Sequence, residues 1–177
     1  MSDILQFKRN AIHLGLCGKY KNLWDACSSK SELVRLALDG NGIEFMSDSI
    51  AFGWGLSRDY LMKEFGEFMN GAYRCQERGY TSEMYVGARG VVSVSSTLVL
   101  AAYCDGLELL VPEHMACKVY VCGGSRLRVE SRGRLELYVY GSDNDIAVDV
   151  ANGGVVLRDD VQKSQWSKSD CVRPVAG

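Results

Sequence analysis

VYVCGGSRLRVESRG (119–133) aligns with LYVYGSDNDIAVDVANGG (137–154), and this internal repeat decides the fold. In each copy, β-branched and aromatic residues alternate with polar ones on both sides of a turn that contains glycine. That pattern is typical of a strand, a turn, a second strand and a second turn. The positions that coincide are Gly123 with Gly141 and, after one inserted residue, Val129 with Val148.

The repeat extends in both directions along the chain. A preceding unit begins near Val99 and a following one near Val155, which gives offsets of 20, 18 and 18 residues. Such units predict a short β-solenoid, because stacked rungs bury a continuous interior that one rung alone cannot bury. An antiparallel meander or sandwich is the alternative, since turns every ~8–12 residues suit those folds as well.

The hydrophobic period changes near residue 80. Before it the spacing is helical, and the expected helices are 3–17, 19–27, 28–42, 43–54 and 57–71. After it the period is two, and the expected strands are 91–103, 118–123, 126–131, 134–141, 145–153 and 155–159. We therefore expect an α+β protein in which a small helical bundle precedes an all-β module.

Three parts of the chain follow from this change of period. Residues 1–78 form a helical domain with a corner that is similar to a helix-turn-helix, 79–160 form a β-repeat domain, and 161–177 form a polar tail. Two sequence signals place helix ends in the first part. Ser29 and Glu32 have the spacing of a capping box, and Ser57 is an expected N-cap. The apolar stripe of the last helix consists of Leu61, Phe65, Phe68 and Met69.

The composition is that of an ordinary globular protein. The 177 residues are 47% hydrophobic and carry a net charge of −2. Each half of the chain (1–86 and 87–177) has 10 basic and 11 acidic residues. Neither half therefore has the net positive charge that is typical of a protein that binds the phosphate backbone of nucleic acids. The start has no apolar signal region, and no apolar run is long enough to span a membrane. We expect a cytoplasmic protein whose seven cysteines are reduced.

Residues 47–66 have the residue types of a helix-turn-helix. Ala51 is the small residue where two helices would touch, Gly55 is the turn glycine, and Leu61 is one of the buried positions. This segment resembles the turn and second helix of bacterial transcriptional regulators, which implies DNA contact through Arg58 and Lys63. The solvent face of the second helix also carries three acidic residues, which repel phosphates, so a purely structural corner is the favoured interpretation.

Two further groups of residues are candidates for binding a macromolecule. Arg126 and Arg128 alternate with apolar residues and share one strand face, which suits either a binding face or a solvated surface with ion pairs to Glu136 or Asp149. Tyr120 and Tyr138 occupy matching places in the repeat. We expect these two tyrosines to stack between rungs, and exposed tyrosines would also suit a binding face.

The sequence has no pattern typical of catalysis or metal binding. The only histidines are His13 and His114, neither of which has an evident orienting partner, and the cysteines lack the spacing of a zinc site. The glycine-rich stretches CGGSR (122–126) and NGG (152–154) lack a following helix, so they are turns and not phosphate loops. We therefore expect no enzyme activity, no cofactor and no metal.

A broader resemblance covers roughly the first 90 residues. The segments KSELVRLALDGNGIEFMSDSIAFGWGLS, YLMKEFGEFMNGAY and GYTSEMYVG are similar to uncharacterised proteins of gut-dwelling Bacteroidales and their mobile elements. This resemblance implies a phage or accessory-gene role and transfers no site residues. The expectation is a non-enzymatic cytosolic binding or assembly protein with a protein partner, and a DNA-binding regulator that uses 47–66 is the alternative. Open rung edges further predict self-association into a homo-oligomer.

Overall fold

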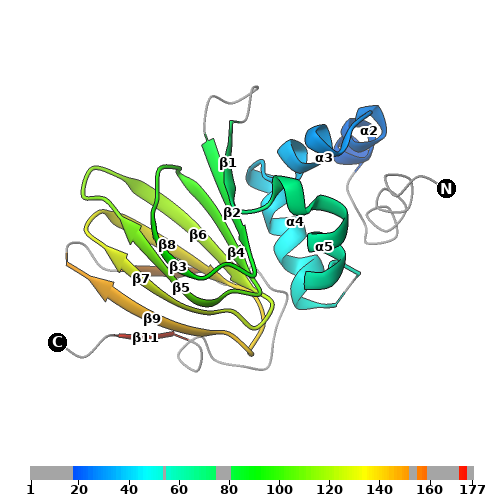
Figure 1. Ribbon diagram of the computed structural model, residues 1–177. Helices are drawn as coiled ribbons and strands as arrows, with labels where there is room; N and C mark the ends of the chain where they lie inside the picture. Colours follow the sequence, from blue (N-terminus) through cyan, green and yellow to red (C-terminus); the bar gives the residue numbers. More distant parts are fainter. Residues whose placement is uncertain (1–17, 54, 75–80, 152–154, 159–171, 175–177) are drawn as a thin grey trace.

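The chain folds into a group of helices followed by two parallel β-sheets. The computed structural model describes residues 18–53, 55–74, 81–151, 155–158 and 172–174. Figure 1 shows the helices on one side of the β module, next to the layer that contains β2, β4 and β6. The predicted α+β class with a C-terminal β-solenoid is confirmed. The antiparallel meander is excluded, because strands of successive rungs pair in parallel.

The chain alternates between the two sheets as it winds. Sheet A has the order β1 (Gly71–Arg74), β2 (Thr81–Val86), β4 (Leu98–Ala102), β6 (Ala116–Cys122), β8 (Arg134–Val139) and β10 (Val155–Arg158). Sheet B has the order β11 (Val172–Pro174), β9 (Asp145–Val150), β7 (Arg126–Ser131), β5 (Asp105–Val111) and β3 (Gly90–Ser93). Only β1 runs antiparallel to its neighbour among these described pairs, and it extends sheet A by one strand beyond β2.

The register agrees with the internal repeat. Val99 lies opposite Val119, and Val119 lies opposite Leu137, which are the offsets of 20 and 18 residues predicted from the sequence. Val129 and Val148 are also partners. The last unit differs, because Val155 pairs with Leu135, two residues away from the partner that the third offset of 18 requires.

The interior of the solenoid is apolar. Alternate residues of both sheets point into it, because successive side chains of a strand point to opposite faces. The buried set includes Val99, Leu107, Leu109, Val119, Val121, Leu127, Val129, Leu135, Leu137, Ile146 and Val148. The other face of sheet A is apolar too, and it forms a second core with the helices. Sheet A is therefore a buried central layer, as continuous hydrophobic strands such as LVLAA indicate.

Among the described residues, four α-helices and one short 3-10 helix form the layer next to sheet A. They are α2 (Gly18–Ala26), α3 (Lys30–Ala37), α4 (Gly40–Ala51), α5 (Arg58–Phe65) and η1 (Gly66–Phe68). The predicted capping box is confirmed, because Ser29 accepts from the Glu32 N–H while the Glu32 carboxylate accepts from the Ser29 N–H. Ser57 caps α5 as expected. The expected helix 3–17 lies outside the described residues. Each helix in the described part of the chain is too short or too polar to cross a lipid bilayer.

α4 begins earlier than the sequence predicted. We expected a stop at Gly40 or Gly42 and a new helix over 43–54, yet α4 starts at Gly40 with Asp39 as its N-cap. Gly42 is buried where α3 and α4 meet, and a β-carbon there would lie 2.3 Å from the Leu36 carbonyl oxygen. The glycine therefore allows close helix contact and does not end a helix.

A column of residues with positive φ supports the helices. Gly87, Tyr103 and Gly123 directly follow β2, β4 and β6, and Gly141 comes two residues after the end of β8. Their φ angles are 62°, 55°, 69° and 91°. α4 packs against this column, because a β-carbon on Gly123 would lie 3.0 Å from Ile50. The Tyr103 hydroxyl donates to the Leu56 carbonyl at 2.7 Å, which ties the connection between α4 and α5 to the solenoid.

A buried polar ladder lies just beyond that column. Asn144 Nδ2 donates to the carbonyls of Tyr140 and Gly141, and its Oδ1 accepts from the Ser125 N–H. The Ser125 hydroxyl in turn accepts from the Cys104 N–H and donates to the Cys122 carbonyl. One side chain from each of two successive rungs thus satisfies backbone groups that the sheets leave unpaired.

Candidate functional site

The matched tyrosines lie between the sheet and the helices. The rings of Tyr120 and Tyr138 stack with centroids 4.5 Å apart and planes at 11°, so the predicted stacking is confirmed. Only 2% of Tyr120 and 7% of Tyr138 is exposed. These rings belong to the core that joins sheet A to the helices. They are therefore not available as an exposed binding face.

The two basic residues expected to contact DNA lie on α5. Its solvent face is exposed at Arg58, Asp59 and Lys63, and Lys63 forms an ion pair with Glu64. The Arg58 side chain lies against the turn after β2, because a β-carbon on Gly87 would lie 2.7 Å from Arg58 Nε. Arg58 therefore packs against the solenoid while α5 keeps a mixed-charge surface.

The described part of the corner has a buried apolar side. Ile50, Leu56 and Leu61 are positions that a helix-turn-helix pattern buries, and they are 5%, 4% and 1% exposed. Phe65 is buried as well, although the pattern puts its last apolar position one residue earlier, at Glu64. Trp54, another expected buried position, lies outside the described residues. This packing serves a structural corner and a helix-turn-helix equally well.

The outer side of sheet B carries a flat array of charges, which we call the sheet B face. It consists of Asp105, Glu108, Leu110, Arg126, Arg128, Glu130, Asp145, Ala147 and Asp149, all on β5, β7 and β9. Parallel register places these side chains in rows across the strands. One row reads Glu108, Arg128 and Ala147, and the next reads Leu110, Glu130 and Asp149.

The arginines of the sheet B face are held between acids. Arg128 lies 3.4 Å from Glu108 on one neighbouring strand and 3.5 Å from Asp149 on the other. The latter is one of the two pairs expected from the sequence. Arg126 lies 3.1 Å from Asp105. Each arginine therefore links neighbouring strands, and Arg128, with a carboxylate on either side, is the more constrained of the two.

A shallow hollow marks one end of the sheet B face. It encloses about 380 Å³ and lies where Gly106 interrupts the pairing of β5 with β7, between the registers of Asp105 and Leu107. Gly106 has a φ of 83°, a backbone conformation that suits glycine. Such bulges redirect strands and side chains. Here the bulge leaves Arg126 and Arg128 along one wall of the hollow.

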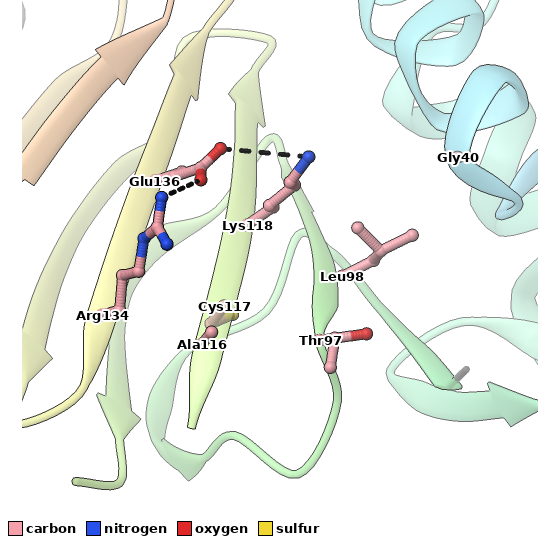
Figure 2. A pocket seen from close by; sticks show the side chains of 8 residues that line it. All are labelled: Gly40, Thr97, Leu98, Ala116, Cys117, Lys118, Arg134 and Glu136. Atoms are coloured by element: carbon pink, nitrogen blue, oxygen red, sulfur yellow. Dashed lines mark hydrogen bonds and ion pairs between the residues drawn. The ribbon is translucent and has the colours of Figure 1, made fainter. Parts of the chain in front are cut away.

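A second hollow lies at the edge of the interface between sheet A and the helices, and we call it the Lys118 pocket. It encloses about 300 Å³ and is lined by Gly40, Thr97, Leu98, Ala116, Cys117, Lys118, Arg134 and Glu136. Figure 2 shows Gly40 at the start of α4 across from the first residues of β4, β6 and β8. The stacked tyrosines fill the same sheet face farther along the strands.

Three charged side chains meet in the Lys118 pocket. Arg134 Nη2 lies 3.3 Å from Glu136 Oε1, and Lys118 Nζ lies 3.9 Å from Glu136 Oε2. The Tyr138 hydroxyl donates to Glu136 Oε2 at 3.0 Å, and Lys118 Nζ lies 5.8 Å from the centre of the Tyr138 ring. The pair of Arg134 with Glu136 replaces the expected pair of Glu136 with the arginines of β7.

Three of the four described cysteines are unreactive because of their buried environment. Cys104, Cys117 and Cys122 are free thiols and buried. Burial raises the pKa of Cys104 to about 11 and, with the nearby Glu83 carboxylate, raises the pKa of Cys117 to about 12. Burial also raises the pKa of Cys122. Thiolate is the nucleophilic form, so these side chains act as small apolar residues at neutral pH.

One acid is buried inside the solenoid. Glu83 is 2% exposed and accepts from the Ser95 N–H at 2.7 Å, from the Ser95 hydroxyl and from the Tyr85 hydroxyl at 3.0 Å. These donors pin the turn between β3 and β4 to β2. Within the described ranges, no three His, Cys, Asp or Glu side chains gather where they could hold a metal ion.

Comparisons with family models, with curated proteins and with solved structures found no match for this chain. The evidence for function therefore comes from the geometry. Sequence reasoning singled out Arg126 and Arg128, which the structure places together, and Arg58 and Lys63, which lie on a different layer. It missed the Lys118 pocket. The signal was present, because the 18-residue offset of the repeat places Lys118 opposite Glu136.

Proposed function

We propose that this protein is a non-enzymatic binding or assembly protein of the cytoplasm and that it contacts another protein through the sheet B face. One observation carries this proposal. Most of both faces of sheet A is buried, apart from the Lys118 pocket at one end, whereas the outer face of sheet B presents a flat, pre-arranged set of charged side chains. In Figure 1 the helices lie on the sheet A side of the solenoid, away from β5, β7 and β9.

The held arginines support recognition of a protein surface. Arg128 is fixed by Glu108 and Asp149, so binding a partner costs little side-chain entropy at this position. Such ordered charges give specificity and association rate more than raw affinity. Arginine is also enriched at protein interfaces. The array can exchange some of its internal ion pairs for equivalent pairs with a partner.

The sign of the charge favours a protein over a nucleic acid. The described side chains of the sheet B face include five acids, Asp105, Glu108, Glu130, Asp145 and Asp149, against the two arginines of β7. Nucleic-acid surfaces need an excess of cations to replace the counterions of the phosphate backbone. The DNA-binding regulator therefore stands as the alternative, and it would act through α5.

Charge reversal on the sheet B face tests the proposal. Wild-type protein, Arg128→Glu and the control Arg35→Glu, which changes an exposed arginine of α3, would be crosslinked in cells of the source organism. We expect one protein to crosslink with wild type and with Arg35→Glu, and to be lost with Arg128→Glu. Equal crosslinking of that protein by all three variants would refute the sheet B face as the interface.

DNA binding by wild type and variants distinguishes the DNA-binding regulator from the proposed protein-binding function. Fluorescence anisotropy with duplex DNA at low and physiological salt would show steep salt-dependent binding if α5 reads DNA. That binding would weaken in Arg58→Ala and Lys63→Ala and be unchanged in Arg128→Glu. Flat curves at both salt concentrations would remove the regulator hypothesis.

A further inference from the structure

The Lys118 pocket is separate from the sheet B face, because it lies on the opposite sheet. Its floor is formed by the first outward-facing positions of three adjacent strands, and the first residue of α4 forms the opposite wall. Parallel register brings Leu98, Lys118 and Glu136 into one row and Ala116 and Arg134 into the row outside it. Regular strands therefore fix the positions of the charged groups, and no loop contributes to this part of the floor.

Cations exceed anions in this pocket. Glu136 is the one acid among the described lining residues, against Lys118 and Arg134. The Asp39 carboxylate, which precedes Gly40, turns to the α4 backbone and accepts from the Gly42 N–H at 2.8 Å and the Tyr20 hydroxyl at 2.6 Å. The lining groups thus leave one net positive charge at the mouth.

Glu136 positions the cations without using up their donors. Its side chain is 14% exposed and accepts from Arg134 and the Tyr138 hydroxyl, with Lys118 Nζ at 3.9 Å. The Lys118 and Arg134 side chains are 47% and 71% exposed, so both remain accessible to a dissolved anion. A guanidinium has five N–H donors and an ammonium has three. Lys118 and Arg134 approach different oxygens of this one carboxylate, Oε2 and Oε1, so both cations lie at the same part of the pocket wall.

We propose that the Lys118 pocket binds a phosphate monoester, with Arg134 and Lys118 holding the phosphate oxygens. Arginine recognises phosphate through paired N–H donors, and lysine adds a point charge. A phosphate monoester carries a charge of about −1.5 to −2 at neutral pH, which exceeds the single charge of a carboxylate and suits a site that already contains Glu136. Thr97, the residue just before β4, also lines the pocket.

The size of the pocket limits the ligand. A volume of about 300 Å³ is at the lower end of the range for small-molecule sites. Leu98 and Ala116 supply the apolar part of the wall. The pocket therefore suits a small phosphorylated compound, of the size of a short-chain or sugar phosphate.

Phosphate titration of the full chain tests this site. The probes would be inorganic phosphate, glycerol phosphate and acetate at low ionic strength, and the readouts would be calorimetry and the amide NMR signals of Gly40 and Thr97. The test variant is Arg134→Ala. Its matched control is Arg126→Ala, since Arg126 is similarly exposed (66%) and is paired with one carboxylate at a similar distance (3.1 Å) on sheet B.

The expected result is saturable binding of both phosphates that moves the Gly40 and Thr97 amides. Arg134→Ala should weaken it about tenfold to a hundredfold, as loss of a charge-assisted hydrogen bond predicts, and Arg126→Ala should leave it unchanged. Lys118→Ala should also weaken it. Non-saturable shifts, equal loss in Arg126→Ala, or acetate binding as tight as phosphate binding would overturn the assignment.

Discussion

Replacement of Asn144 by alanine tests the buried polar ladder. Asn144 is 4% exposed and makes three hydrogen bonds to backbone groups, at 2.8 Å to the Tyr140 carbonyl, 2.9 Å to the Gly141 carbonyl and 2.9 Å from the Ser125 N–H. The variant Asn144→Ala removes all three partners at once. Water has little access to replace them, because Ser125 and Tyr140 are fully buried.

The size of the effect follows from the groups left behind. An N–H group left unsatisfied in a buried position costs about 1–3 kcal/mol, and each further lost hydrogen bond costs about 1 kcal/mol. We therefore expect Asn144→Ala to lower the free energy of unfolding by about 3 kcal/mol. This is a large fraction of the stability of an ordinary domain.

Urea unfolding followed by circular dichroism measures this difference. The midpoint should fall while the slope of the transition stays constant, because the surface exposed on unfolding is nearly unchanged. Asn22→Ala, at an exposed position of α2, is the control and should change stability by less than about 0.5 kcal/mol. A loss below about 1 kcal/mol for Asn144→Ala would refute the reasoning that the amide is the main partner of these backbone groups.

Three more outcomes follow from the core. Gly42→Ala should destabilise the protein by about 2 kcal/mol in the same urea assay, because its β-carbon would overlap the Leu36 carbonyl oxygen. Alkaline pH should lower the free energy of unfolding, because the raised pKa values of Cys104 and Cys117 keep these thiols neutral in the folded state. The stability that depends on the neutral thiols is fully present below pH ~9, and it is lost as the pH rises through about 11 for Cys104 and about 12 for Cys117. Between pH ~9 and the folded pKa, each thiol lowers the free energy of unfolding by up to about 1.4 kcal/mol per pH unit. Urea midpoints measured at about pH 8, 9 and 10 would show this decrease. Tyr138→Phe should cost about 1 kcal/mol and Tyr138→Ala about 3–5 kcal/mol in thermal unfolding, since only the second removes the ring stack; equal losses would argue against the stack.

Much of the solenoid could be predicted from the repeat. Matched residues such as Tyr120 and Tyr138 lie opposite each other because parallel rungs preserve register between neighbouring units. Strands outside the repeat were harder to predict from the sequence. The sequence DGLELLV (105–111) forms β5, but its glycine and its contiguous leucines obscure the alternation of a strand. The single strand expected over 91–103 is two strands, because the chain turns at residues 94–97 to pass from sheet B to sheet A.

The candidate sites show where sequence reasoning stops. Strand alternation alone puts Arg126 and Arg128 on one face, and it predicted the pair with Asp149. It could not show that the helices cover most of the outer face of sheet A, including Tyr120, because the packing of α4 on β4 and β6 is a contact between distant parts of the chain. The Lys118 pocket depends on the same packing, since its far wall is a helix distant in sequence. Contacts between layers are therefore the information that a periodic pattern lacks.

The antiparallel strand β1 has an evolutionary consequence. It closes the sheet A edge at the first rung with a strand of opposite direction, so a duplicated unit of the chain cannot be inserted between β1 and β2 without breaking that pairing. Duplication toward the C-terminal end meets no such barrier, because each rung there repeats the parallel pairing of the last. Each added rung would widen the sheet B face by one strand spacing, about 4.8 Å, and leave the contact with the helices untouched. Lineages that carry this architecture should therefore differ in length on the side of β9 and agree on the side of β1.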